Sequence, residues 1–333
     1  MNHLRLSRLS RLSRLFGLVG MLGLALAARS AVAADPWVPD RVIHLVSPSP
    51  PGGGTDAVAR LLATKLGELA RWQVVVDTKP GAGNNIGLEF GARSAPDGYT
   101  AVLGETSNLA VNQFLYKKLG FDPVKDLTPV ALVGTGVSVL VVNAGSPYRS
   151  LDALLAAAKT KELTYASSGN GTVGHLVAEN LRVTKGVSLL HVPYKGGGPA
   201  MADMLGGQVD FYISSLVSAV PLIRDHKLRA LAVTSGARDP LLPEVPTFVE
   251  SGYPGFEYYT LYGVVVPART PEHIVSTMNQ EINRVLEAPG VKANLAARGI
   301  YTRPGTPADF ATFLTQERGK WGALVKASGA TAE

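Results

Sequence analysis

Short apolar runs alternate with amphipathic stretches along most of the chain, and this alternation is the feature that most constrains its fold. The runs at 41–47 and 73–79 are typical of strands. Between them Val58, Leu62 and Leu66 recur at helical spacing. Strands that alternate with helices form α/β folds. The sequence therefore predicts an α/β protein.

Two longer β-rich stretches, 129–142 and 256–268, enclose a self-contained series of strand–helix units. This arrangement predicts one α/β domain inserted into another, with 35–136 and 257–333 in lobe 1 and 137–256 in lobe 2. Two β-rich hinge segments would join the lobes, which favours closure around a ligand. A single large doubly wound sheet is the alternative that the pattern leaves open.

Residues 1–34 are typical of an export signal. Basic residues precede an apolar run at 15–28, which is too short to span a bilayer, and a small-x-small sequence ends at Ala33. We expect cleavage near Ala33 or Ala34, so that the mature chain starts at Ala34 or Asp35. An uncleaved membrane anchor is the alternative.

Charge and cysteine content narrow the functional classes. The formal charge is +6, but five arginines and no acid lie in the leader, so the remainder carries +1. This balance gives no support to nucleic-acid binding. The chain has no cysteine, so its stability has to come from core burial. We therefore expect a soluble protein of the bacterial periplasm.

Glycine-rich loops that follow predicted strands and open helices lie at 50–56, 79–87, 167–174 and 194–199. Glycine lets the backbone approach a ligand closely. The helix that follows directs its free N–H groups and its positive dipole end into the same space. Such loops suit a phosphate, a sulfate or a carboxylate.

Nucleotide and enzyme motifs are missing. Asp56 stands where a Walker loop needs lysine, and the GxGxxG match at 169–174 has no acid about twenty residues later to hold a ribose. There is no GxSxG elbow, and the histidines show no metal-binding spacing. We expect no enzymatic activity, no cofactor and no metal.

Several of the polar candidates have a structural interpretation as well as a ligand-binding one. Asp56 is a potential helix cap or loop organiser, His175 a structural donor near a helix start, and Lys195 a solvated loop residue. A carboxylate is nevertheless a plausible ligand. Four or five hydrogen bonds of about 1.5–3 kcal/mol each reach the scale of a micromolar complex.

Six ordered blocks of the sequence resemble the Bug family, the extracytoplasmic solute receptors of tripartite tricarboxylate transporters. The blocks are SPSPPGGGTDAVAR, KPGAGNNIG, LYKKLGFDPVKDLTPV, YASSGNGTVGHL, HVPYKGGGPAMADMLGGQVD and LRALAVTSGARDPLLPEVPTFVESGYPGFE. The resemblance implies a two-lobed periplasmic-binding-protein fold of type II. It also implies a ligand held by its carboxylate between the lobes, partly through ordered waters.

The resemblance implies which residues bind the ligand, by position in these blocks. The expected ligand-binding residues are Ser49, Gly53, Gly54, Thr55, Asp56 and Ser107 from lobe 1, and Ser168, Asn170, Thr172, His175, Tyr194, Lys195 and Ser214 from lobe 2. The sequence departs from the family twice. Ser49 stands where relatives often have an aromatic residue, and Asn84 where they have glycine. The smaller Ser49 leaves room beside the carboxylate, so a relative's ligand does not transfer directly.

We expect a monomeric receptor that captures a small carboxylated solute and delivers it to the membrane permease subunits of a tripartite transporter. Two alternatives stay open from the sequence. One is a ligand-sensing adaptor for a membrane sensor kinase, and the other is an exported hydrolase on a similar fold.

Overall fold

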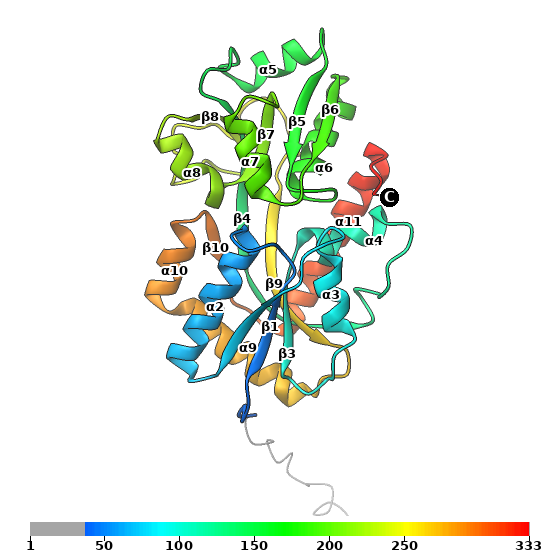
Figure 1. Cartoon of the computed structure of the whole chain (residues 1–333), viewed down its shortest axis with the longest axis vertical. Helices are drawn as coiled ribbons and strands as arrows, with labels where there is room; N and C mark the ends of the chain where they lie inside the picture. Colours follow the sequence, from blue (N-terminus) through cyan, green and yellow to red (C-terminus); the bar gives the residue numbers. More distant parts are fainter. Residues whose placement is uncertain (1–36, 333) are drawn as a thin grey trace, which may run out of the picture. The chain divides into compact units, whose positions relative to one another are not determined.

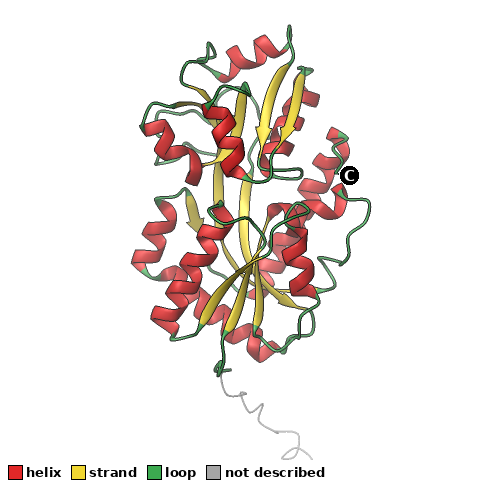
Figure 2. Ribbon diagram, in the orientation of Figure 1, coloured by secondary structure: helices red, strands yellow, loops and turns green. Residues whose placement is uncertain are grey.

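The computed structural model describes residues 37–332, and the expected export signal lies outside this range. Helices lie on either side of the strands (Figure 2). The strands are β1 (Ile43–Ser47), β2 (Val74–Thr78), β3 (Thr100–Glu105), β4 (Leu127–Asn143), β5 (Leu163–Ser167), β6 (Leu189–Pro193), β7 (Phe211–Ser215), β8 (Leu228–Val233), β9 (Tyr259–Pro267) and β10 (Ile300–Thr302).

The helices mostly follow the strands along the chain. They are α2 (Gly54–Ala70), α3 (Asn85–Ala92), the π-helix η1 (Ser107–Val111), α4 (Asn112–Leu115), α5 (Leu151–Ala158), α6 (Val173–Lys185), α7 (Gly197–Leu205), α8 (Leu216–Arg224), α9 (Glu272–Glu287), α10 (Pro289–Ala296) and α11 (Pro307–Ser328).

The protein has a two-lobed α/β fold, as predicted (Figure 1). The first lobe contains the parallel strands β2, β1 and β3 with α2, α3, α9 and α10. The second lobe contains the parallel strands β6, β5 and β7, with β8 and α5 to α8. The strand order is β2-β1-β3-β9-β4-β7-β5-β6, and β8 and β10 both pair with β4.

The long strand β4 runs through both lobes. Its first part, up to Val137, pairs antiparallel with β9, and its second part, from Ser138 to Asn143, pairs with β7 and β8. Fourteen of its seventeen residues are buried, so β4 is a central strand and not a solvated edge. The β-rich stretches predicted at 129–142 and 256–268 are therefore observed as β4 and β9.

Alternating side chains of the strands enter separate cores on the two faces of each lobe. Leu45 of β1 packs with α2, α9 and α10, whereas the next residue, Val46, packs with α3 and α11. In β4, Val139 packs with α7 and α8, and Leu140 packs with α5 and α6. This period of two explains why these strands are apolar at successive positions: both faces are covered.

The C-terminal helix α11 packs against both lobes. It starts at a capping box formed by Thr306 and Asp309, and its first half buries Phe310 against the first lobe. Its second half buries Trp321 and Leu324 in the core that contains α6. The sequence-based boundary assigns all of residues 257–333 to lobe 1, whereas the packing of α11 is shared between the lobes.

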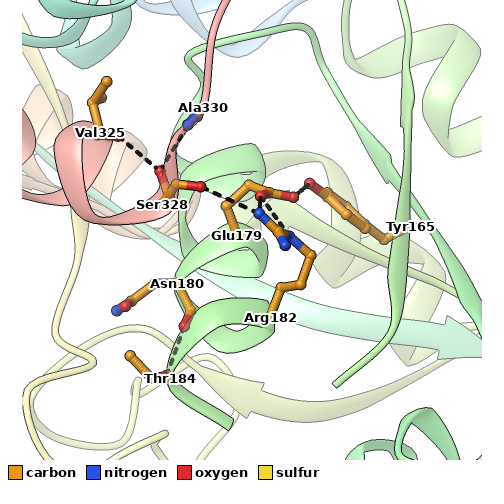
Figure 3. Close-up of polar contacts among 8 residues, drawn as sticks. All are labelled: Tyr165, Glu179, Asn180, Arg182, Thr184, Val325, Ser328 and Ala330. Carbon is orange, nitrogen blue, oxygen red and sulfur yellow. Dashed lines mark hydrogen bonds and ion pairs between the residues drawn. The ribbon is translucent and has the colours of Figure 1, made fainter. Parts of the chain in front are cut away.

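A polar network fastens the end of α11 to the second lobe (Figure 3). The Arg182 guanidinium donates to the Ser328 carbonyl at 3.2 Å and to Glu179 Oε2 at 2.8 Å. The hydroxyl of Tyr165 donates to Glu179 Oε1 at 2.7 Å. Since the last carbonyls of a helix have no partner within the helix, Arg182 supplies one from outside.

Residues 107–115 do not form a regular α-helix. They form a five-residue π-helix followed by one short α-helical turn. The cause is tertiary. The Asn108 side chain bonds the Glu105 N–H and the Asn84 carbonyl, and Asn112 donates to Gly83 O at 2.8 Å. These buried amides hold the segment against the loop after β2, and π-turns of this kind are frequent at functional sites.

Candidate ligand-binding site

A cavity of about 970 Å³ lies where the parallel strands of both lobes end. Most of its lining comes from the carboxyl ends of β1, β2, β3, β5, β6 and β7 and the loops that follow them. Open α/β sheets bind ligands in the crevice outside the carboxyl ends of their strands. The fold therefore places six chain segments, three from each lobe, around one space.

Helices begin at this cavity without side-chain caps. The N-cap residues of α2, α6, α7 and α8 are Gly53, Thr172, Gly196 and Ser215, and all four line the cavity. None of their side chains bonds a first-turn N–H group. By contrast, Ser150 caps α5, away from the cavity, by accepting from the Ala153 N–H at 3.1 Å.

Uncapped first turns around one cavity have a clear electrostatic consequence. The first N–H groups of a helix have no partner within the helix, and they carry the positive end of its dipole. Several such ends facing one space make it suitable for an anion. The neutral backbone supplies this potential, so the site needs few cationic side chains.

Glycines in the loop after β5 allow a close approach between chain segments. Gly171 has φ +79°, and a Cβ there would lie 2.7 Å from Asn112 Oδ1 of the first lobe. A Cβ at Gly174 would lie 2.3 Å from the carbonyl oxygen of Ile213 on β7. The GxGxxG pattern therefore reflects packing of this loop, in agreement with the exclusion of a dinucleotide site.

Ten of the thirteen expected ligand-binding residues line the cavity. From the first lobe and its loops come Ser49, Gly53, Gly54, Thr55 and Ser107, and from the second lobe come Ser168, Asn170, Thr172, Tyr194 and Lys195. Their contact with a ligand stays a prediction. The structure does not bring Asp56, His175 and Ser214 to the cavity lining.

Asp56 and Ser214 are turned into the protein. The Asp56 side chain is buried, and its Oδ2 accepts from the Gly52 N–H at 3.0 Å and from Arg60 Nε at 2.9 Å. It thus organises the loop that precedes α2. Ser214 is also buried, and its hydroxyl donates to the Ser215 carbonyl at 3.3 Å.

His175 lies beneath the loop after β5 and holds it in place. Its Nδ1 accepts from the Gly171 N–H at 3.1 Å, and its ring stacks on His191 with 4.1 Å between ring centroids. Burial lowers the pKa of His175 to about 4. Burial, followed by the effect of His175, lowers the pKa of His191 to about 3. Both rings are therefore neutral at ordinary pH.

Two tyrosines contribute to the second-lobe wall. The Ser168 hydroxyl lies 2.5 Å from the hydroxyl of Tyr212, which lines the cavity and was not predicted. The Tyr194 hydroxyl donates to Asp203 at 2.5 Å, and burial together with that carboxylate raises the pKa of Tyr194 to about 12. Burial raises the pKa of Tyr212 as well, so both phenols are neutral, and Tyr194 is oriented by Asp203.

The sequence interpretation missed Glu105, which lies at the end of β3 and lines the cavity. The hydroxyl of Thr55 donates to Glu105 Oε2. Ser107 Oγ and Asn84 Nδ2 donate to Oε1 at 2.9 Å and 2.6 Å. An acid at the end of a buried strand, two residues before the expected Ser107, is the signal that could have identified it.

Tyr262 on β9 was also missed. Its ring is buried, it lines the cavity, and its hydroxyl lies 3.3 Å from where a Cβ on Gly54 would be. Burial and the charge of Glu105 raise the pKa of Tyr262. Among the described residues that line the cavity, Glu105 is the acidic side chain and Lys195 the basic one.

Two lobes with an anion-suited cavity at the ends of their parallel strands define a solute-binding protein of the periplasmic type. The chain belongs to the TctC family, the tripartite tricarboxylate transporter family receptors, whose model matches residues 58–330. Members of this family are solute receptors and not enzymes, which argues against the hydrolase alternative. The family assignment also favours the transport receptor over the sensor-kinase adaptor.

Named relatives agree with this assignment. The chain is 38% identical to protein BugT of Bordetella pertussis over 302 residues, which is 90% of this chain and 92% of BugT. It is similar to the structure of R. palustris Rpa4515 with adipate, with TM-score 0.85, 33% identity and coverage of 88% and 99% of the two chains. The structure of the periplasmic binding protein BugD gives TM-score 0.83, 32% identity and coverage of 89% and 100%.

The family is periplasmic, and no helix within residues 37–332 has the length and apolar character needed to cross a membrane.

Proposed function

We propose that this chain captures a small carboxylate in the cavity between its lobes and delivers it to the membrane permease of a tripartite tricarboxylate transporter. The observation that carries the proposal is the set of uncapped helix first turns around one cavity. Membership of the TctC family and the adipate bound by a structural relative support the same conclusion.

The proposal includes the mode of binding. Residues 35–136 and 257–333 would form lobe 1 and residues 137–256 lobe 2, with β4 and the return to β9 acting as the hinge. The ligand carboxylate accepts from N–H groups at the starts of α2 and α6. It also accepts from the expected donors of the second lobe that line the cavity, such as Asn170 and Lys195. The chain acts as a monomer, exported by a signal at residues 1–34 that is removed near Ala33.

A thermal-shift and calorimetry screen tests the function directly. The panel contains mono-, di- and tricarboxylates, amino acids and aromatic acids. We expect at least one member to stabilise the protein and to bind with micromolar affinity or better. If no carboxylate raises the melting temperature or gives binding heat, the proposed function is wrong.

The Gly53→Val variant tests the place of binding. A Cβ at Gly53 would already lie 3.2 Å from the Pro50 carbonyl oxygen, so the valine side chain would crowd the opening of α2. We expect at least tenfold weaker binding with a similar melting temperature. Gly290→Val is the matched control, because Gly290 is exposed at the start of α10, and a Cβ there meets nothing within 4 Å.

A further inference from the structure

Glu105 gives the first-lobe wall a negative charge. Its carboxylate is partly exposed at the end of β3 and lines the cavity. Its backbone N–H donates to Asn108 Oδ1 at 2.9 Å, which fixes the residue at the start of η1. An acidic side chain is an unexpected component of a cavity that otherwise suits an anion.

The hydrogen bonds of Glu105 determine what the surrounding groups can offer a ligand. A carboxylate accepts about four hydrogen bonds and donates none. Glu105 Oε1 accepts from Ser107 and Asn84, and Oε2 accepts from Thr55. One acceptor position, on Oε2, is therefore left for a ligand.

The two hydroxyl groups beside Glu105 are acceptors toward the cavity. A hydroxyl has one proton, and Thr55 and Ser107 each give theirs to the Glu105 carboxylate. Only their lone pairs remain for a ligand. A ligand carboxylate placed here would meet three acceptor oxygens and a like charge, which is unfavourable. Thr55 and Ser107 were expected to donate hydrogen bonds to a ligand carboxylate, whereas their geometry makes them acceptors.

The second-lobe wall of the cavity, opposite Glu105, offers hydrogen-bond donors and positive charge. Lys195 lines the cavity from the loop after β6, and the uncapped first turns of α6 and α7 start beside it. The cavity thus has a donor-rich, positive wall on the second lobe and an acceptor-rich, negative region at Glu105. A ligand with one carboxylate and one cationic donor satisfies both walls at once.

We propose that the ligand is an amino-substituted carboxylate, whose ammonium group binds Glu105, Thr55 and Ser107 and whose carboxylate faces the helix starts and Lys195. This inference rests on the proposed function, because it specifies the ligand class for the same cavity. An ammonium group supplies three N–H donors and a positive charge. It therefore matches three acceptor oxygens around a carboxylate better than a hydroxyl group does.

Matched probes separate the ammonium group from the rest of the ligand. Succinate, malate and aspartate have the same four-carbon dicarboxylate skeleton and differ by hydrogen, hydroxyl or ammonium at one carbon. Propionate, lactate and alanine, and glutarate, 2-hydroxyglutarate and glutamate, form equivalent series at other lengths. Calorimetric titration of each probe gives an affinity ratio of the amino acid to its unsubstituted acid.

We expect at least a tenfold preference for the amino acid in the series that binds tightest. Glu105→Gln keeps the side-chain shape and removes the charge, so the ratio should fall about tenfold. Glu68→Gln, on the exposed end of α2, is the matched control and should leave the ratio unchanged. Thr55→Val keeps the β-branched shape and removes one acceptor. It is the second variant, and we expect a several-fold fall.

The outcomes distinguish the two proposals. If unsubstituted acids bind as well as amino acids in every series, the inference is overturned while carboxylate binding still supports the proposed function. If amino acids are preferred but neither Glu105→Gln nor Thr55→Val changes the ratio, the assignment to Glu105 is wrong. If no probe or other carboxylate binds the unmodified protein, both proposals fall.

Discussion

Individual polar residues in this protein are oriented by their buried partners rather than by their place in a motif. His175 and Asp56 both follow glycine-rich loops in the sequence, yet each turns inward and supports its loop. Lys195 and Glu105, which come from different lobes, are the charged side chains at the cavity. Charge at the site is therefore sparse, and we propose that backbone dipoles carry most of the anion recognition.

Lys195 is exposed, so its contribution to carboxylate binding is screened by solvent. We expect Lys195→Met to weaken binding of the tightest carboxylate by about 1 kcal/mol, or roughly fivefold, with an effect that shrinks at high salt. Lys117→Met, on an exposed loop outside the cavity lining, is the control. Equal affinities of the two variants across salt concentrations would exclude a role for Lys195.

Buried His175 predicts a pH dependence of stability. Its pKa falls from an ordinary 6.5 to about 4 in the folded protein, so the unfolded chain binds a proton first as the pH falls. The contribution of His175 to the free energy of unfolding is therefore fully present above pH 6.5. It decreases by about 3 kcal/mol as the pH falls from 6.5 to 4.

Denaturant titrations at several pH values measure this effect. We expect the His175→Gln variant to show a flatter profile between pH 6.5 and 4 than the unmodified protein. The control His273→Gln replaces an exposed histidine and should keep the original slope. An unchanged slope in His175→Gln would contradict the assignment of this pH dependence to the buried ring.

At the scale of elements, α11 and β4 connect the two lobes in different ways. The backbone of strand β4 continues from one lobe into the other. Its first part pairs with β9 and its second part pairs with β7. The helix α11 instead contacts both lobes through side chains, and its end is held by Arg182. Loss of the Arg182 contact with α11 should therefore lower the stability of the protein, while β4 still connects the two lobes.

The Arg182→Met variant should destabilise the protein by about 1–3 kcal/mol. The substitution leaves the Glu179 side chain, which is only 10% exposed, with the Tyr165 hydroxyl as its remaining partner. It also removes a donor from the Ser328 carbonyl. Chemical denaturation is the measurement, and Lys125→Met, in an exposed ion pair with Asp122, should change stability by less than about 1 kcal/mol.

Most elements could be predicted from the sequence because the buried strands are continuous apolar runs and the helices have amphipathic spacing. The π-helix at Ser107–Val111 could not, since the buried amide of Asn108 forms it through contacts with another loop. The place of Glu105 in the cavity wall could not be predicted from the sequence either. Its partners Thr55 and Asn84 come from loops that only the fold brings together.

At the scale of the whole described protein, the cavity depends on the relation between the lobes. A loop of the second lobe approaches the first lobe at Gly171 and Asn112, and Gly196 approaches Pro50. These contacts lie around the cavity, whereas β4 links the lobes through its continuous backbone. Opening of the lobes would therefore separate the two walls of the site and release the ligand.

Small-angle X-ray scattering tests this motion. We expect the radius of gyration to decrease when a saturating carboxylate from the screen is added, because binding favours the conformation with both walls in contact with the ligand. The Gly53→Val variant at the same ligand concentration should show a smaller decrease. Identical scattering with and without ligand, under conditions where calorimetry shows saturation, would argue against hinge closure.

We propose that open helix starts at the cavity hold the ligand's carboxylate. A crystal structure of the chain with its tightest-binding carboxylate tests this most directly. We expect the carboxylate oxygens within about 2.7–3.2 Å of first-turn N–H groups of α2, α6 or α7. A ligand bound outside this cavity, or one inside it with its carboxylate turned away from every helix start, would contradict the claim.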